Sequence, residues 1–330
     1  MNSIEFEKQF INLIGKQRLL QWENYAFDKK HDLNKVNEEI FNLIKNNTPN
    51  NMFNGRKKEL YERLYKKFII ENDSEIAFLR NKLDNKNNYN FDLNQSDKDY
   101  KFKLAKCMRK DVIKLLHLRN KKAKKMGHLS YPDLIFYTEE LDKKHVIKKV
   151  KEYLNKNIEK ANKLINKYEL TWDNWFEVLR STGIIDNNNP DYYINCLLNK
   201  MGLNSIKKNI KFKFKKDGIS GMAFGISIPN DIRILSKPVV SPMTCKVLLH
   251  ECGHAINYAC NKEKGIYTIY TTSFDEIMAT LFETIGIDIC MSQKAGKIAN
   301  EIKFLESIRC CISFLFEMEL WKKTDKAEEL

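Results

Sequence analysis

Glycine and proline are scarce in this chain, whose 330 residues include 12 glycines and 6 prolines. These two residues mark turns and interrupt regular structure, so their scarcity disfavours a fold made of many short, turn-linked segments. Apolar residues recur instead mostly at spacings of three and four, which is the period of an amphipathic helix. We therefore expect a mainly α-helical protein.

Long apolar runs and paired cysteine motifs are also lacking. No stretch approaches the roughly eighteen uninterrupted apolar residues that a membrane span requires. The first residues, MNSIEFEKQFINLIGKQ, mix charges into their apolar positions, unlike a secretory signal. None of the eight cysteines shows CxxC spacing, so buried thiols in a reducing compartment are their simplest interpretation. We expect a cytoplasmic protein without a membrane partner.

Arginine is rare compared with lysine, although the net charge is +14. A strongly basic chain suggests a nucleic-acid partner, but direct base recognition depends largely on arginine side chains. The lysines here are spread over nearly every segment rather than gathered in one patch. We therefore expect no specific nucleic-acid partner.

The sequence pattern changes near residue 203. Before it, helical spacing predicts helices over 3–27, 34–46, 57–83, 98–126, 131–141, 145–168, 172–181 and 190–201. After it, 206–216 alternates apolar residues with lysine, and 218–235 holds two further short apolar stretches around a Pro-Asn-Asp turn. These features predict a small antiparallel sheet leading into a helix capped at Ser241 and Pro242. We divide the chain into an N-terminal helical region, 1–202, and a second region, 203–330.

The stretch LLHECGHAIN lies in that capped helix. His250 and His254 are four residues apart, so both imidazoles project from one helical face and can bind one zinc ion. Glu251 lies beside them, where a carboxylate can take a proton from metal-activated water. The alternative is chance, but histidine is rare here, with six in the chain, and Gly253 is costly inside a helix. The spacing therefore predicts a zinc site with Glu251 as general base.

A catalytic zinc ion needs a third protein ligand. Glu276 follows His250 by 26 residues, which leaves room for a loop and a second helix, and we predict that it is this ligand. Locally, Ser273 and Glu276 fit a helix-capping box equally well. Asp275 and Glu283 are the fallback ligands, and Glu283 is better suited to hold a ligand histidine through its second ring nitrogen.

HECGH followed by FDEIMATLFE resembles the gluzincin zinc metallopeptidases of the oligoendopeptidase F and thimet oligopeptidase family. In that family an HExGH motif is followed by a helix that supplies the third ligand. Two further segments, 113–142 and 224–234, resemble its helical region and the strand pair beside its zinc helix. The resemblance spans roughly residues 100–320, strongest at the zinc motif.

The resemblance implies a zinc-dependent endopeptidase for short peptides. It assigns His250, His254 and Glu276 as ligands of one Zn²⁺ and Glu251 as the base. It also implies that about a hundred C-terminal residues of the family pattern, with their Tyr and His oxyanion donors, are missing.

This departure leaves three explanations: a truncated form, a complementing C-terminal chain, or a minimal enzyme with substitute donors. Tyr258, Tyr267 and Tyr270 are the nearby phenols. The alternative function is a catalytically impaired fragment or pseudoenzyme that binds peptides or a partner chain.

The segment 221–235 carries the substrate hypothesis. An exposed strand edge beside the zinc would bind an extended peptide through main-chain hydrogen bonds. The alternative is an ordinary hairpin covering the catalytic helix, and the two interpretations are compatible.

Overall fold

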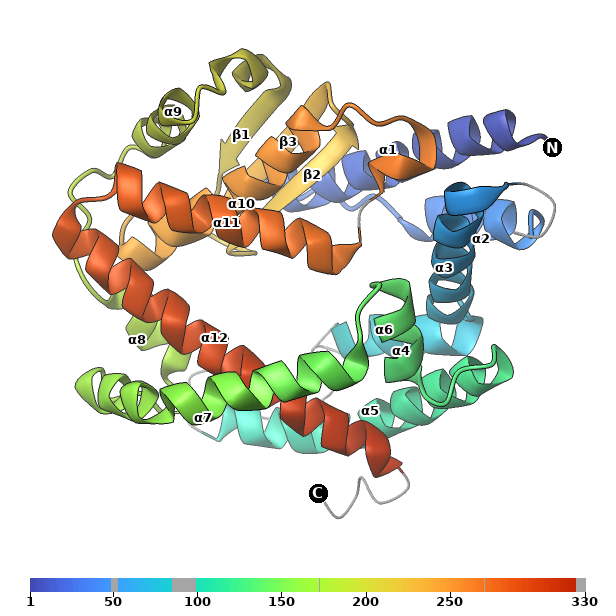
Figure 1. The fold of residues 1–330 in the computed structure, drawn as a ribbon, viewed down its shortest axis with the longest axis horizontal. Helices are drawn as coiled ribbons and strands as arrows, with labels where there is room; N and C mark the ends of the chain where they lie inside the picture. Colours follow the sequence, from blue (N-terminus) through green and yellow to red (C-terminus); the bar gives the residue numbers. More distant parts are fainter. Residues whose placement is uncertain (49–52, 85–98, 172, 270, 325–330) are drawn as a thin grey trace.

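The computed structural model describes residues 1–48, 53–84, 99–171, 173–269 and 271–324. Helices hold most of these residues, and one small sheet lies against the helix that carries HECGH (Figure 1). The mainly α fold predicted from the sequence is confirmed. In chain order the elements are α1 (Ser3–Phe27), α2 (Asn34–Lys45), α3 (Gly55–Glu71), α4 (Ser74–Asp84), α5 (Tyr100–Lys125), α6 (Tyr131–Thr138), α7 (Lys143–Lys167), α8 (Trp175–Ser181), α9 (Pro190–Lys200), the 3-10 helix η3 (Asn204–Asn209), β1 (Ile210–Phe214), β2 (Gly221–Ser227), β3 (Asp231–Ser236), α10 (Pro242–Cys260), the 3-10 helix η4 (Gly265–Thr268), α11 (Thr272–Cys290) and α12 (Gln293–Lys322).

The predicted helix over 57–83 is wrong in one respect, because it is two helices. α3 ends at Glu71 and α4 begins at Ser74. Asn72 donates from its side chain to the Phe68 carbonyl, and such local side-chain bonding favours helix ends over helix interiors. The helix expected over 172–181 begins at Trp175, and Trp172 lies outside the described residues. So does most of the predicted loop over 81–97.

The sheet is mixed rather than antiparallel, with the strand order β1-β3-β2. β2 and β3 form the expected antiparallel hairpin. β1 runs opposite to β2, but β3 inserts between the two and therefore lies parallel to β1. Periodicity predicts each strand and not which neighbour it pairs with, so the sequence did not give this order.

α10 and α11 lie side by side beneath the sheet (Figure 1). Gly253 permits their close approach, because a Cβ there would stand 2.7 Å from the Ala279 Cα. A second contact has the same form, where Gly286 of α11 lies against the Leu249 side chain. The close packing fixes the distance between the two helices that carry the candidate ligands.

The surrounding helices join the sheet and α10 at several points. α1 runs along β2, where a Cβ on Gly15 would meet the Ile226 carbonyl at 2.6 Å. α12 leaves the end of α11 and runs beside α7 (Figure 1). Leu197 and Leu198 of α9 share a core with α10. The division at residues 202 and 203 remains a prediction.

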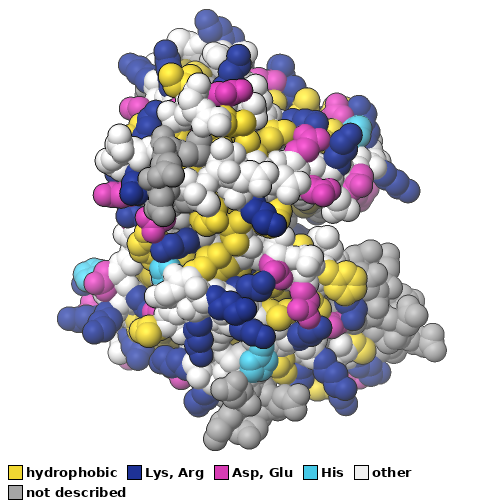
Figure 2. Space-filling view, turned by 90° about the vertical axis from the view of Figure 1, so that its right-hand side faces the viewer, with side chains coloured by type: hydrophobic (Ala, Val, Ile, Leu, Met, Phe, Trp, Pro, Cys, Tyr) yellow, Lys and Arg dark blue, Asp and Glu magenta, His cyan; other side chains and the backbone are white. Residues whose placement is uncertain are grey.

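No described helix combines the length and the apolarity that crossing a membrane requires. On the face shown in Figure 2, Lys and Arg side chains are scattered among Asp and Glu rather than gathered in one patch.

Candidate metal centre

α10 begins where its sequence predicts. The Ser241 side chain accepts from the Thr244 N–H, Thr244 bonds back to the Ser241 backbone, and Pro242 occupies the first turn. These contacts satisfy helix N–H groups that would otherwise lack partners. The resulting regular helix places His250 and His254 one turn apart, with ring centroids separated by 4.9 Å.

The two histidines present their Nε2 atoms to Glu276 of α11. His250 Nε2 lies 3.3 Å from one Glu276 carboxylate oxygen, and His254 Nε2 lies 3.8 Å from the other. Two ligands bound at about 2 Å to one tetrahedral ion are roughly 3.3 Å apart. One atom from each side chain lies within 4.8 Å of the others. The three residues therefore form a group that could hold a metal ion.

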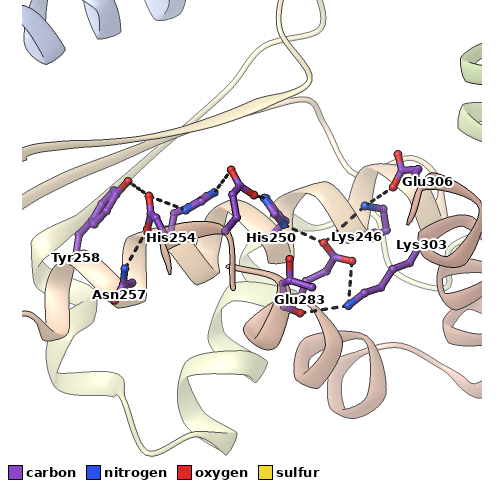
Figure 3. Close-up of polar contacts among 11 residues, drawn as sticks. Lys246, His250, His254, Asn257, Tyr258, Glu283, Lys303 and Glu306 are labelled. Atoms are coloured by element: carbon purple, nitrogen blue, oxygen red, sulfur yellow. Dashed lines mark hydrogen bonds and ion pairs between the residues drawn. The ribbon is translucent and has the colours of Figure 1, made fainter. Parts of the chain in front are cut away.

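Each histidine meets a second carboxylate through its Nδ1 atom (Figure 3). His250 Nδ1 lies 3.0 Å from Glu283 Oε2, and His254 Nδ1 lies 3.1 Å from Asp275 Oδ2. A carboxylate on Nδ1 fixes the tautomer that leaves Nε2 as the ligand atom. Glu283 thus lies where its predicted supporting role requires. Asp275, a fallback ligand in the sequence analysis, instead supports the other histidine.

Glu276 is available as a metal ligand because the capping box with Ser273 does not form. The N-cap of α11 is Thr271, whose side chain accepts from the Phe274 N–H. The Ser273 N–H donates to Glu139 Oε2 at the end of α6. Ser273 and Glu276 both lie inside the helix.

Glu251 lies between α10 and the sheet and is buried. A Cβ on Gly221 of β2 would come within 2.8 Å of Glu251 Cγ, so the missing side chain lets this carboxyl approach the strand. Burial raises the pKa of Glu251, while His250 and His254, and a backbone hydrogen bond from Ala223, act in the opposite direction.

The charges of the cluster perturb one another. Burial alone would lower the pKa of His250, but the contacts with Glu276 and Glu283 outweigh it and raise the pKa to about 9. The hydrogen bond to His250 lowers the pKa of Glu276. Burial favours neutral Glu283, yet His250, Lys246 and Lys303 together bring its pKa below the usual range. The carboxylates therefore keep their charge and increase the basicity of the imidazole.

The two described tyrosines near the site, Tyr258 and Tyr267, contact other side chains. Tyr258 donates its hydroxyl to Asp275 Oδ2 at 2.5 Å, and the Tyr267 ring lies under Lys57 Nζ. Tyr270 lies outside the described residues. Through Asp275, Tyr258 takes part in supporting His254.

Sequence reasoning missed several residues around this cluster. Lys246 and Lys303 approach Glu283, and Asn257 donates to Asp275 Oδ1. One signal was present for Lys246, which lies one helical turn before His250 on the same face of α10. No protein-family model matches this chain, and a search of curated proteins found no match either.

Proposed function

We propose that this chain is a zinc-dependent endopeptidase that hydrolyses short peptides, as its resemblance to the oligoendopeptidase F and thimet oligopeptidase family implies. The observation that supports this best is the convergence of His250 Nε2 and His254 Nε2 on the Glu276 carboxylate. Two imidazole nitrogens and one carboxylate are the donor set of many catalytic zinc sites. His250 Nδ1 forms a hydrogen bond with Glu283, and His254 Nδ1 lies 3.1 Å from Asp275 Oδ2, which supports a metal ion bound at the Nε2 atoms.

Bound zinc supplies a Lewis acid that polarises the scissile carbonyl and makes water more acidic. Glu251 accepts a proton from the attacking water and later gives it to the leaving amine. The position of Glu251 supports this role, since it follows one ligand directly in α10 and reaches β2. His250, His254 and Glu276 would hold the ion.

The edge of β2 offers a place for an extended peptide. Among the described strands β2 pairs only with β3. The Ser220 carbonyl accepts from the Lys237 N–H. Hydrogen-bonded and non-hydrogen-bonded residue pairs alternate along two antiparallel strands, so the N–H and C=O groups of Gly221 and Ala223 point away from β3. α1 covers the far end of the edge, where Arg18 donates to the Gly225 carbonyl. A peptide on this end of the edge would bind through Gly221 and the Ala223 carbonyl and would lie next to Glu251, which accepts from the Ala223 backbone.

Cleavage of internally quenched peptides tests the proposal. We expect zinc-dependent cleavage that a chelator abolishes and added zinc restores. Glu251→Gln should keep its zinc and lose activity by about two to four powers of ten, the usual contribution of a general base. A wild-type protein that binds zinc and peptides without cleaving them would favour the peptide-binding alternative.

A further inference from the structure

Lys246 is a buried cation one helical turn before His250. Its side chain is 9% exposed, and its Nζ lies 2.8 Å from Glu306 Oε2 of α12 and 3.7 Å from Glu283 Oε2 of α11. Lysine is almost never buried without a charged partner. Here one ammonium group bridges carboxylates from two different helices.

The Glu283 carboxylate is contacted at both oxygens. Its Oε2 faces His250 Nδ1 at 3.0 Å as well as Lys246. Its Oε1 faces Lys303 Nζ of α12 at 3.4 Å. Lys303 is itself fixed by donating to the Thr280 carbonyl at 3.2 Å. Figure 3 shows the resulting chain of contacts from Glu306 through Lys246 and Glu283 to His250.

The free-energy cost of burying charged groups makes the position of Lys246 informative. Buried ion pairs seldom add net stability compared with apolar residues of similar volume, so packing α10 against α12 gives no reason for a lysine here. Glu283, however, must be correctly turned to hold the Nδ1 proton of His250. Two flanking ammonium groups serve that requirement directly.

We propose that Lys246 and Lys303 are positioning residues that fix the Glu283 carboxylate against His250, so that α12 sets the orientation of this metal ligand. The inference rests on the metal site of the proposed function. It does not require the chain to be an active peptidase.

The His254 side provides the matched control. Asp275 receives Asn257 Nδ2 at 3.0 Å and the Tyr258 hydroxyl at 2.5 Å, and both donors belong to α10. Neither lysine is recorded in contact with Asp275. A change at Lys246 should therefore act through Glu283 and leave the Asp275 contacts intact.

Zinc affinity, measured on the purified full chain by competition with a chromogenic chelator, tests the proposal. We expect Lys246→Met to weaken zinc binding about tenfold, at the lower end of effects from groups that support metal ligands. Lys246→Arg, which keeps a cation, should restore most of the affinity. The absorption spectrum of the Co²⁺-substituted protein should change in Lys246→Met, because the His250 imidazole reorients.

A double-mutant cycle separates positioning from simple structural support. Lys246→Met combined with Glu283→Gln should weaken binding no further than Glu283→Gln alone, whereas its combination with Asp275→Asn should be additive. If Lys246→Met does not fold, Lys303→Met is expected to give the same pattern with a smaller effect.

The outcomes separate this inference from the proposed function. Wild-type affinity in a folded Lys246→Met or Lys303→Met variant, beside weakened binding in Asp275→Asn, would overturn the inference and leave the metal site standing. A wild-type chain that binds no zinc would overturn both. Zinc binding without peptide cleavage, with the expected lysine effects, would overturn the peptidase proposal alone.

Discussion

The two histidines of HECGH are supported in chemically different ways. His254 meets Asp275, which is held by neutral donors, Asn257 and Tyr258, from the same helix as the histidine. His250 meets Glu283, which is held by Lys246 of α10 and Lys303 of α12. We call these the neutral arm and the ionic arm.

The difference shows how one short motif can depend on distant parts of a chain. In the neutral arm, the hydrogen bonds to Asp275 come from α10, which packs directly against the first turn of α11. Arg18 of α1 adds an electrostatic interaction with Asp275 and Tyr258. The ionic arm needs residues more than 50 positions beyond His250, on α12. Ion pairs are also more sensitive to the loss of one partner than neutral hydrogen bonds are.

The largest effect is expected from removing the carboxylate that both histidines face. Glu276→Ala deletes the carboxylate facing both Nε2 atoms, and we expect zinc affinity to fall by more than about a hundredfold, beyond the range for supporting groups. Asp288→Asn, which removes an exposed acid from the same helix, is the control and should bind zinc normally. Equal affinity in the two variants would remove Glu276 from the ligand set.

The next comparison sets Glu283→Gln against Asp275→Asn. Each should weaken zinc binding about ten- to hundredfold, because each histidine loses its Nδ1 carboxylate. Glu283→Gln leaves Lys246 and Lys303 facing an uncharged group in a buried site, so its unfolding free energy should drop by about 3 kcal/mol. Asp275→Asn should lose about 1 kcal/mol. Urea unfolding of both variants checks this, and equal losses would show that the arms do not differ.

A backbone change should affect both arms together. In Gly253→Ala the new Cβ would stand 2.7 Å from the Ala279 Cα, and overpacking of this kind costs about 1–3 kcal/mol. The better helix propensity of alanine returns roughly 1 kcal/mol, so we expect a net loss of up to about 2 kcal/mol in thermal unfolding.

Gly296→Ala is the matched control for that change. Its nearest neighbour would be the Ile287 carbonyl oxygen at 3.5 Å, which is ordinary contact, so alanine should be neutral or slightly stabilising. Similar behaviour of the two variants would mean that α10 and α11 do not pack as closely as described.

The smallest effect is expected at Tyr258, which belongs to the neutral arm. Tyr258→Phe removes only the hydroxyl that donates to Asp275, which Asn257 still contacts. We expect a loss of about 1 kcal/mol in stability and a less than about tenfold change in zinc affinity. A loss of zinc affinity as large as that of Asp275→Asn would show that the Tyr258 hydroxyl controls the neutral arm.

Local signals were sufficient for the inner part of the site. The cap at Ser241 and the spacing of His250 and His254 predicted a helix with both imidazoles on one face, and α10 has that form. Glu276 and Glu283 are seven residues apart, which placed them on one helical face, and α11 brings both to His250.

Features that depend on tertiary context were not predictable in this way. A lysine in a helix normally indicates solvent, so Lys246 gave no sign of its partner Glu306, 60 residues later. Strand periodicity could not reveal that β3 inserts between β1 and β2. The C-cap of α3 is Asn72, whose side chain bonds to the Phe68 carbonyl, and helical spacing does not detect such a contact.

The central claim is that His250, His254 and Glu276 together bind zinc. Elemental analysis of the purified, folded chain beside His250→Ala tests it most directly. We predict about one zinc per chain in the wild type, as a single three-ligand site requires, and none in the variant. A folded, monodisperse wild type without zinc, or a variant that keeps its zinc, would contradict the claim.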